Sequence, residues 1–326
     1  MAVAAGKLAH DRFARAKPSR AYRLKDDEAV PDGIRRIALG RIDHALEELR
    51  GKADSTPEEA VHEARKDMKK LRGLVRLVRG ELGEEAYKRE NAAFRDTGRL
   101  LSGVRDADVM VATLDKLAER YPKELPPDAS GGLRQALEGR KPEDDRSQAA
   151  RQAVELLEQV WDRVDDWPLQ ADGFDALEDG LRQVYARGRK AFRAAKDDPS
   201  AERLHEWRKR AKDLWYHHVL LQCSWPEAID PLSEQAHELS DHLGDDHDLA
   251  GLAEWAKEHA AAAGGLYAVQ ELNDVIELRR GELQADAFVL GERLYAERPG
   301  AFRRRFRGYW RSGRTARSAQ AQPRPA

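Results

Sequence analysis

The chain has 326 residues, with 57 Lys and Arg against 59 Asp and Glu, 41% hydrophobic residues and 36% charged residues. This composition excludes disorder throughout the chain and is typical of long amphipathic helices with solvated faces. The single cysteine, Cys223, excludes an intramolecular disulfide and a thiolate zinc site, and no signal peptide or membrane span is recognisable. We therefore expect a cytoplasmic protein that has no membrane partner.

Both ends of the chain are expected to be disordered tails. Residues 1–17 form a basic N-terminal tail, and residues 312–326 are rich in Arg, Ala, Gln and Pro and lack periodic apolar positions. Between the tails, apolar residues recur at intervals of three and four, and no alternating β-branched run appears. The sequence therefore predicts an all-α fold for residues 18–311.

Two helix starts and one linker are recognisable in chain order. Thr56 is a candidate N-cap, followed by Pro57 at the first helical position and by Glu59 as the capping-box partner. Asp198-Pro199 is expected to open a second helix in the same way. Residues 121–146 concentrate Pro, Gly and charge, which predicts a linker between a first half, about 18–120, and a second half, about 147–311.

The two halves contain a repeated motif. VHEARKDMKKLR begins at Val61 and LHEWRKRAKDLW begins at Leu204, and six of the twelve positions are identical. At nearly the same offset, LSGVRD at Leu101 corresponds to LGDDHD at Leu243. Two correspondences at one offset indicate a duplicated helical unit, so we expect the halves to pack with pseudo-two-fold symmetry.

The repeated helices each have a basic face. On a helix the cations of the first copy fall within an arc of about 120°, beside an apolar arc and away from the acids. Neighbouring like charges such as Lys69 and Arg72 repel each other, which indicates either pairing with other helices or an anion that neutralises the face. The candidate anion-binding residues are His62, Arg65, Lys66, Lys69, Arg72 and Arg76 in the first copy and His205, Arg208, Lys209 and Lys212 in the second.

The duplicated motif resembles the CHAD family, the conserved histidine α-helical domain. Further similarities are Tyr22-Arg23-Leu24 and the segment LGERL that begins at Leu290, so the resemblance covers about residues 18–311. It implies two pseudo-symmetric halves, each similar to a four-helix bundle, in one elongated domain around a basic central groove or pore. It further implies non-enzymatic binding of inorganic polyphosphate and association with polyphosphate granules.

This sequence departs from the family pattern at several positions. Trp215 and Val219 stand where the second copy would have basic residues, so the second half is expected to contribute less positive charge. Lys66 stands where the first copy of the family is commonly apolar, and it is the weaker candidate for that reason. The basic residues suit a phosphate polymer because Arg engages two phosphate oxygens at once, Lys is a mobile point charge and His is a proton-dependent donor.

Arg105-Asp106 and His247-Asp248 occupy corresponding places after a glycine, where we expect a break in the helix. Arg105 and His247 are candidates to extend the phosphate-binding surface, with Asp106 and Asp248 orienting them. The alternative is that both aspartates cap or orient helices and pair with a basic residue. Outside the motif, Arg36 and Arg99 are further candidates for the same groove.

Two other functions remain open at this stage. His205, His242 and His247-Asp248 suggest a metal-dependent HD-type phosphohydrolase, although Arg105, the counterpart of His247, cannot bind a metal. The second alternative is nonspecific nucleic-acid binding through residues 298–326, which contain nine arginines and no acid. The preferred interpretation is a polyphosphate-binding module with no cofactor, no metal and no specific nucleic-acid partner, and with its oligomeric state open.

Overall fold

The computed structural model describes residues 19–101, 106–125, 127–138, 144–261 and 263–321. Within these ranges the regular secondary structure is helical and contains no β-strand, which confirms the all-α fold. The helices of the first part of the chain are α2 (Val30–Leu49), α3 (Pro57–Leu77), α4 (Arg79–Leu100), α5 (Asp106–Arg120), α6 (Pro127–Glu138) and α7 (Asp144–Trp161). Those of the second part are α8 (Asp175–Asp197), α9 (Ala201–Leu221), α10 (Pro226–Glu258), α11 (Leu266–Leu294) and α12 (Pro299–Ala321).

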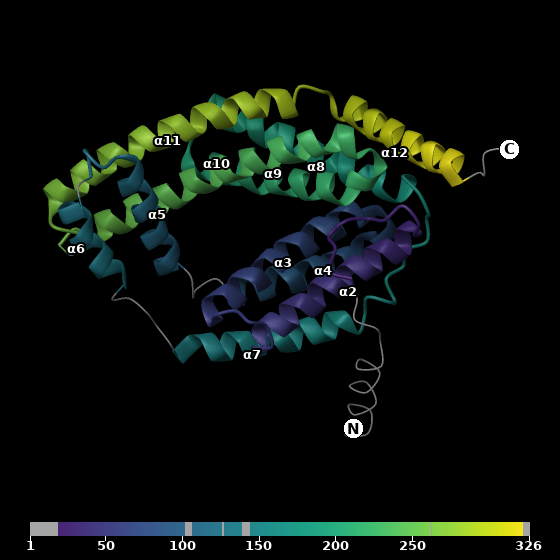
Figure 1. The fold of residues 1–326 in the computed structure, drawn as a ribbon, viewed down its shortest axis with the longest axis horizontal. Coiled ribbons are helices and arrows are strands. Elements are labelled where there is room, and N and C mark those ends of the chain that lie inside the picture. Colours follow the sequence, from purple (N-terminus) through teal and green to yellow (C-terminus); the bar gives the residue numbers. More distant parts are fainter. Residues whose placement is uncertain (1–18, 102–105, 126, 139–143, 262, 322–326) are drawn as a thin grey trace, which may run out of the picture.

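Eight of these helices form two groups of four. In the first group α3 and α7 each pack against both α2 and α4, and in the second group α9 and α11 each pack against both α8 and α10. Figure 1 shows the first group below the second, with α5 and α6 at one end of the elongated molecule and α12 at the other. The pseudo-two-fold relation between the halves stays a prediction.

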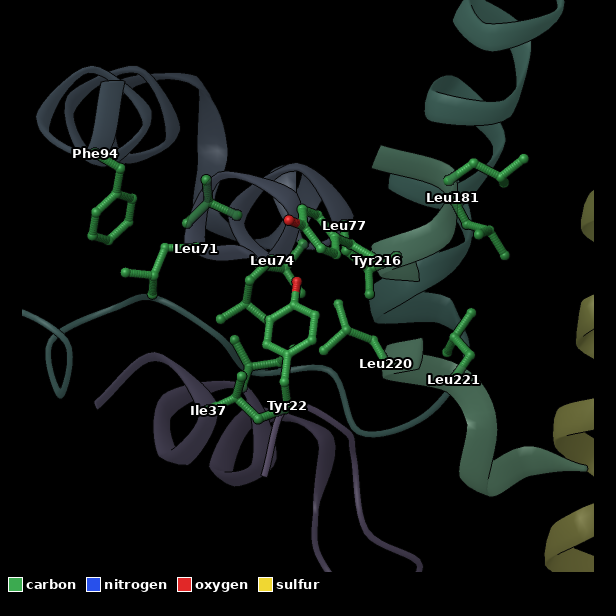
Figure 2. Packing of buried hydrophobic residues seen from close by; sticks show 14 of the residues in the cluster. Tyr22, Ile37, Leu71, Leu74, Leu77, Phe94, Leu181, Tyr216, Leu220 and Leu221 are labelled. Carbon is green, nitrogen blue, oxygen red and sulfur yellow. The ribbon is translucent and has the colours of Figure 1, made fainter. Parts of the chain in front are cut away.

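One hydrophobic core passes through both groups. Leu71 and Leu74 of α3 belong to the same buried cluster as Tyr216 and Leu220 of α9, and Figure 2 shows these side chains converging. The two groups approach so closely that a Cβ atom at Gly180 of α8 would lie only 2.0 Å from the carbonyl oxygen of Leu77 in α3. Only glycine permits this crossing of α8 and α3, so the relative position of the groups is set by backbone contact.

Helices α5 and α6 are held by a second cluster. Leu114 and Leu117 of α5 and Leu137 of α6 are buried against Leu252 of α10 and Ile276 of α11. This cluster is separate from the main core, so α5 and α6 rest on the ends of α10 and α11 that extend beyond the second group.

The helix boundaries differ from the sequence expectations at several points. Helix α6 lies inside the expected linker, and α7 packs with α2 and α4 in the first group because its apolar side chains, such as Leu157, enter the main core. Helix α12 continues past Ser312 to Ala321, since Ala, Arg and Gln favour helix and no proline occurs before Pro323. The expected N-terminal tail, residues 1–17, lies outside the described residues.

The capping predictions have mixed outcomes. The capping box at Thr56 and Glu59 is confirmed, with both reciprocal hydrogen bonds present. The expectation for Asp198-Pro199 was wrong, because α9 begins at Ala201 after Ser200, and Asp198 ends the preceding helix. None of the described helices has the length and apolar character needed to cross a membrane.

Two buried histidines predict how stability depends on pH. His217 and His218 are fully buried in α9, and burial lowers their pKa values to about 4 and about 3. Unfolded histidine binds a proton below about pH 6.5, whereas these two stay neutral in the folded chain until lower pH. Their contribution to stability is therefore complete above pH 6.5 and decreases as the pH falls towards 4.

When the pH is lowered from 7 to 5, we expect the free energy of unfolding to decrease by about 2 kcal/mol for each of the two histidines. Urea denaturation at both pH values measures this loss. The variant His217→Gln should lose about 2 kcal/mol less than the parent, while His237→Gln, at a half-exposed position, is the control. An unchanged pH dependence in the His217 variant would contradict the prediction.

A candidate anion-binding cleft between the two helix groups

A cleft of about 890 Å³ separates the first helix group from the second. Its walls are formed by α3 and α4 on one side and by α9 and α10 on the other, with the first turn of α5 contributing Val109 and Met110. We call it the basic cleft. Its remaining lining residues are His62, Arg65, Lys66, Met68, Lys69, Arg72, Arg76, Phe94, Arg95, Gly98, Arg99, His205, Glu206, Arg208, Lys209, Arg210, Lys212, Asp213, Tyr216, His247, Asp248 and Gly251.

The charge of the lining is strongly one-sided. Eleven of its residues are Lys or Arg and three are Asp or Glu, although the whole chain has slightly more acids than bases. Seven of the eleven cations belong to α3 and α4 and four to α9. The smaller share of α9 agrees with the expectation drawn from Trp215 and Val219. The fold therefore gathers positive charge from three helices into one concave surface, where low-dielectric walls strengthen the local potential.

The cations of α3 are oriented by contacts to α4 and to the residue that follows it. The Arg65 guanidinium donates to the carbonyl oxygen of Leu101 at 3.5 Å, and Nε of Arg72 donates to Oδ1 of Asn91 at 3.3 Å. Burial lowers the pKa of Arg72 to about 10, and the neighbouring charge of Arg76 lowers it further in the same direction. The Arg72 guanidinium is thus partly desolvated and lies beside a like charge.

A buried ion pair closes one end of the cleft, where α3 and α9 cross. Nη1 of Arg76 lies 2.6 Å from Oδ1 of Asp213, and Nη1 of Arg210 lies 3.3 Å from the other carboxylate oxygen. A hydrogen bond of 3.0 Å between His217 and the carbonyl oxygen of Gly73 joins the same two helices one turn away. These contacts involve the C-terminal halves of both helices, whereas the first two turns line the opposite part of the cleft.

Two histidines face each other between α9 and α10. The ring centroids of His205 and His247 are 4.2 Å apart. Burial lowers the pKa of His205 to about 4, and His247, Lys209 and Arg208 add to this effect; the pKa of His247 is lowered as well, chiefly by burial. Protonation of both rings is therefore disfavoured. This differs from the sequence expectation of a donor that titrates near neutral pH, because local burial and positive charge disfavour protonation.

Gly244 of α10 provides space for the Arg208 side chain. A Cβ atom at Gly244 would lie 3.3 Å from both Nε and Nη2 of Arg208. The expected helix break at this glycine was wrong, since α10 continues from Pro226 to Glu258. The glycine therefore serves close packing against a cleft arginine. Within the described residues, Nε of Arg208 and Nδ1 of His205 are buried without a hydrogen-bond partner.

Most of the candidate residues from the sequence meet in the cleft. All ten candidates of the two repeated helices line it, together with His247, Asp248 and Arg99. Arg105 lies outside the described residues, and Asp106 is the first residue of α5, with a side chain that the structure does not describe. Arg36 is not among the lining residues and instead forms an ion pair with Glu28.

Four charged residues of the cleft were not predicted from the sequence, namely Arg95, Glu206, Arg210 and Asp213. Arg95 lies one turn before Arg99 on α4, a spacing that would have identified it once Arg99 was considered. Arg210 and Asp213 escaped notice because their repeat counterparts, Asp67 and Lys70, have the opposite charge. A comparison of the two repeats identifies residues that both copies share and misses residues that only one copy contains.

His242, considered for the phosphohydrolase, and the described arginines of α12, considered for nucleic-acid binding, do not line the cleft. His242 pairs with Glu238 on its own helix, and the part of the chain that the structure describes contains no group of three or more His, Cys, Asp or Glu suited to a metal ion. In the Arg-rich C-terminal segment, Arg305 binds Glu297, and Arg307 binds Asp175 of α8 at 2.7 Å. Some of these arginines thus hold α12 against the second helix group.

Comparisons with known proteins agree with this architecture. A family model described as "CHAD domain" matches residues 36–257, more than half of the chain. Among solved structures, the chain is similar to the crystal structure of the CHAD domain from the plant Ricinus communis, at 17% sequence identity and a TM-score of 0.52, covering 96% of this chain and 99% of that chain. No curated protein matches the chain.

The histidine pair allows a direct test of the electrostatics of the cleft. We expect His205 to titrate near pH 4 in an NMR pH titration, because burial and nearby positive charge both disfavour its protonated form. The variant Lys209→Gln should raise this pKa by removing one cation, whereas Lys257→Gln, at an exposed position on α10, should leave it unchanged. A wild-type titration near pH 6.5 would contradict the described surroundings of the ring.

Proposed function

The chain belongs to the CHAD domain family, and from this premise we propose that it binds inorganic polyphosphate in the basic cleft without catalysing a reaction. The observation that supports the proposal best is the gathering of eleven Lys and Arg side chains around one cleft that contains only three acids. Linear polyphosphate has about one negative charge for each internal phosphate, so it matches a surface of repeated cations better than a neutral or cationic ligand would.

The cleft offers the donor types that phosphate oxygens require. Arginine donates through a planar fork that can engage two oxygens of one phosphate, while lysine is a mobile point charge. Arg208 is the best placed arginine of α9, since it is packed against Gly244 and its Nε lacks a hydrogen-bond partner within the described residues. An anion at this position would supply the acceptor for a donor that is otherwise costly to bury.

Some of the cations pair with acids on their own helix. Lys66 lies 2.7 Å from Glu63, and Lys209 lies 3.6 Å from Glu206, in both cases between partly exposed side chains. Exposed pairs of this kind contribute about 0–1 kcal/mol, so a polyanion can replace the acids at little cost. The buried pair of Arg76 and Asp213 is different, and we assign it a structural role at the closed end of the cleft.

The proposal includes the location of the protein in the cell. A module whose affinity for polyphosphate comes from many charge contacts accumulates where the polymer accumulates, so we propose association with polyphosphate granules. Binding itself needs neither a metal nor a second substrate in this scheme. The proposed location therefore depends on the proposed ligand.

The first test removes four cleft cations at once. The variant with Arg65, Lys69, Arg208 and Lys212 changed to Gln should lose at least about 100-fold in polyphosphate affinity in calorimetry, because four charge-assisted contacts disappear. Its circular dichroism spectrum should keep the helical signal. The matched control changes four exposed lysines outside the cleft to Gln and should keep the wild-type affinity; these are Lys52, Lys88, Lys190 and Lys257.

The same titrations separate the alternatives. DNA with the same phosphate content should bind more weakly than polyphosphate, and deletion of residues 312–326 should leave polyphosphate binding intact. If DNA bound more tightly than polyphosphate, and the deletion of residues 312–326 abolished DNA binding, the nucleic-acid function would be favoured. Release of inorganic phosphate that stops on addition of a chelator would favour the phosphohydrolase. Unchanged polyphosphate affinity in the folded quadruple variant would refute the cleft as the binding site.

The second test uses the two glycines of α10 that lie near the cleft. The variant Gly244→Val should lower polyphosphate affinity about 10-fold, because the new side chain displaces the Arg208 guanidinium by direct contact. The control Gly251→Val changes a cleft-lining glycine whose Cβ would meet nothing within 4 Å. Both variants place the same residue in the same helix, so equal effects would argue against a specific role for Arg208.

A further inference from the structure

The size and charge of the basic cleft determine how much of a phosphate chain it can engage. Eleven cations against three acids leave an excess of eight positive charges in the lining. A chain segment that balances this excess has about eight consecutive phosphates, at about one charge each.

The length of the cleft leads to a similar conclusion. On the α3 wall the lining runs from His62 to Arg76, which corresponds to about 21 Å of helix. On the α9 wall it runs from His205 to Tyr216, about 16 Å. Three phosphates in line are too short to reach both His62 and Arg72, the outermost cation of α3 outside the buried pair of Arg76 and Asp213, whereas an extended chain of about eight follows the whole wall.

Repulsion within the cleft favours complete over partial occupancy. The pKa of Arg72 is lowered to about 10 by burial and then by the charge of Arg76, and the pKa of His205 is lowered by His247, Lys209 and Arg208 in addition to burial. Neighbouring cations thus disfavour a further positive charge at both parts of the cleft. A bound segment relieves this repulsion everywhere only if it spans the full length.

Building on the proposed function, we propose that the cleft engages one linear segment of about eight phosphates, so that affinity rises steeply with chain length up to that number and then becomes nearly constant. The ligand class is therefore a linear chain of medium length or longer. Tripolyphosphate and compact polyanions fill the cleft only in part.

The test combines chain length with salt concentration. Full-length protein is titrated with tripolyphosphate, with chains of about eight phosphates and with chains of about one hundred, each at several salt concentrations. We expect about 100-fold tighter binding of the octamer than of tripolyphosphate. The slope of log K against log salt should be about −6 for the octamer and the same for the longest chain, since it reports the number of phosphates engaged. This slope does not depend on how many binding registers a long chain offers.

Variants and alternative ligands make the outcomes decisive. The double variant Arg65→Gln, Lys69→Gln should make the slope of log K against log salt less steep by about 1.4. The control double variant Lys52→Gln, Lys190→Gln should leave the slope unchanged. Equal affinity for tripolyphosphate and the octamer, tighter binding of inositol hexakisphosphate, or a slope that still grows between eight and one hundred phosphates would each overturn the inferred length. No binding at any length would instead refute the proposed function itself.

Discussion

Eleven lysine and arginine side chains share the walls of one cleft, and their mutual repulsion opposes any packing that brings α3 and α9 together. The structure resists this repulsion with contacts at the closed end of the cleft. There the carboxylate of Asp213 accepts from Arg76 and Arg210, and Gly73 permits close approach of Tyr216. Because removal of one partner of a buried ion pair is strongly destabilising, this carboxylate links the charge of the site to the stability of the fold.

The helix arrangement follows from this requirement. Each group of four helices buries its own apolar faces, but the core that joins the groups is formed by α3, α8 and α9, next to the crossing where the ion pair lies. The crossing uses glycine at Gly180, where backbone meets backbone. The cations of the cleft are therefore presented by helices whose opposite faces are buried in the main core. Such support holds the side chains of a charged surface in position.

The two copies of the repeated motif have become unequal. The α3 copy contributes cations along four turns, whereas on α9 the later positions are Trp215 and Val219, which pack against the main core. The α9 copy instead contributes His205, which faces His247 of α10, and Arg208, which packs against Gly244. The α3 and α4 wall thus supplies most of the positive charge. The α9 and α10 wall supplies partly buried groups, among them Nε of Arg208 and Nδ1 of His205, which lack a hydrogen-bond partner within the described residues.

The sequence by itself determined the helical fold, the duplicated motif and the basic faces of α3 and α9, because these depend on spacings of three and four residues within one helix. Only the tertiary structure decided which further residues join them. Arg95 and Arg210 enter the cleft through helix packing, α7 joins the first group although it follows the expected linker, and His205 is neutral because burial and neighbouring cations disfavour its charge. Packing and desolvation depend on residues far apart in the chain, which periodicity within a single helix does not report.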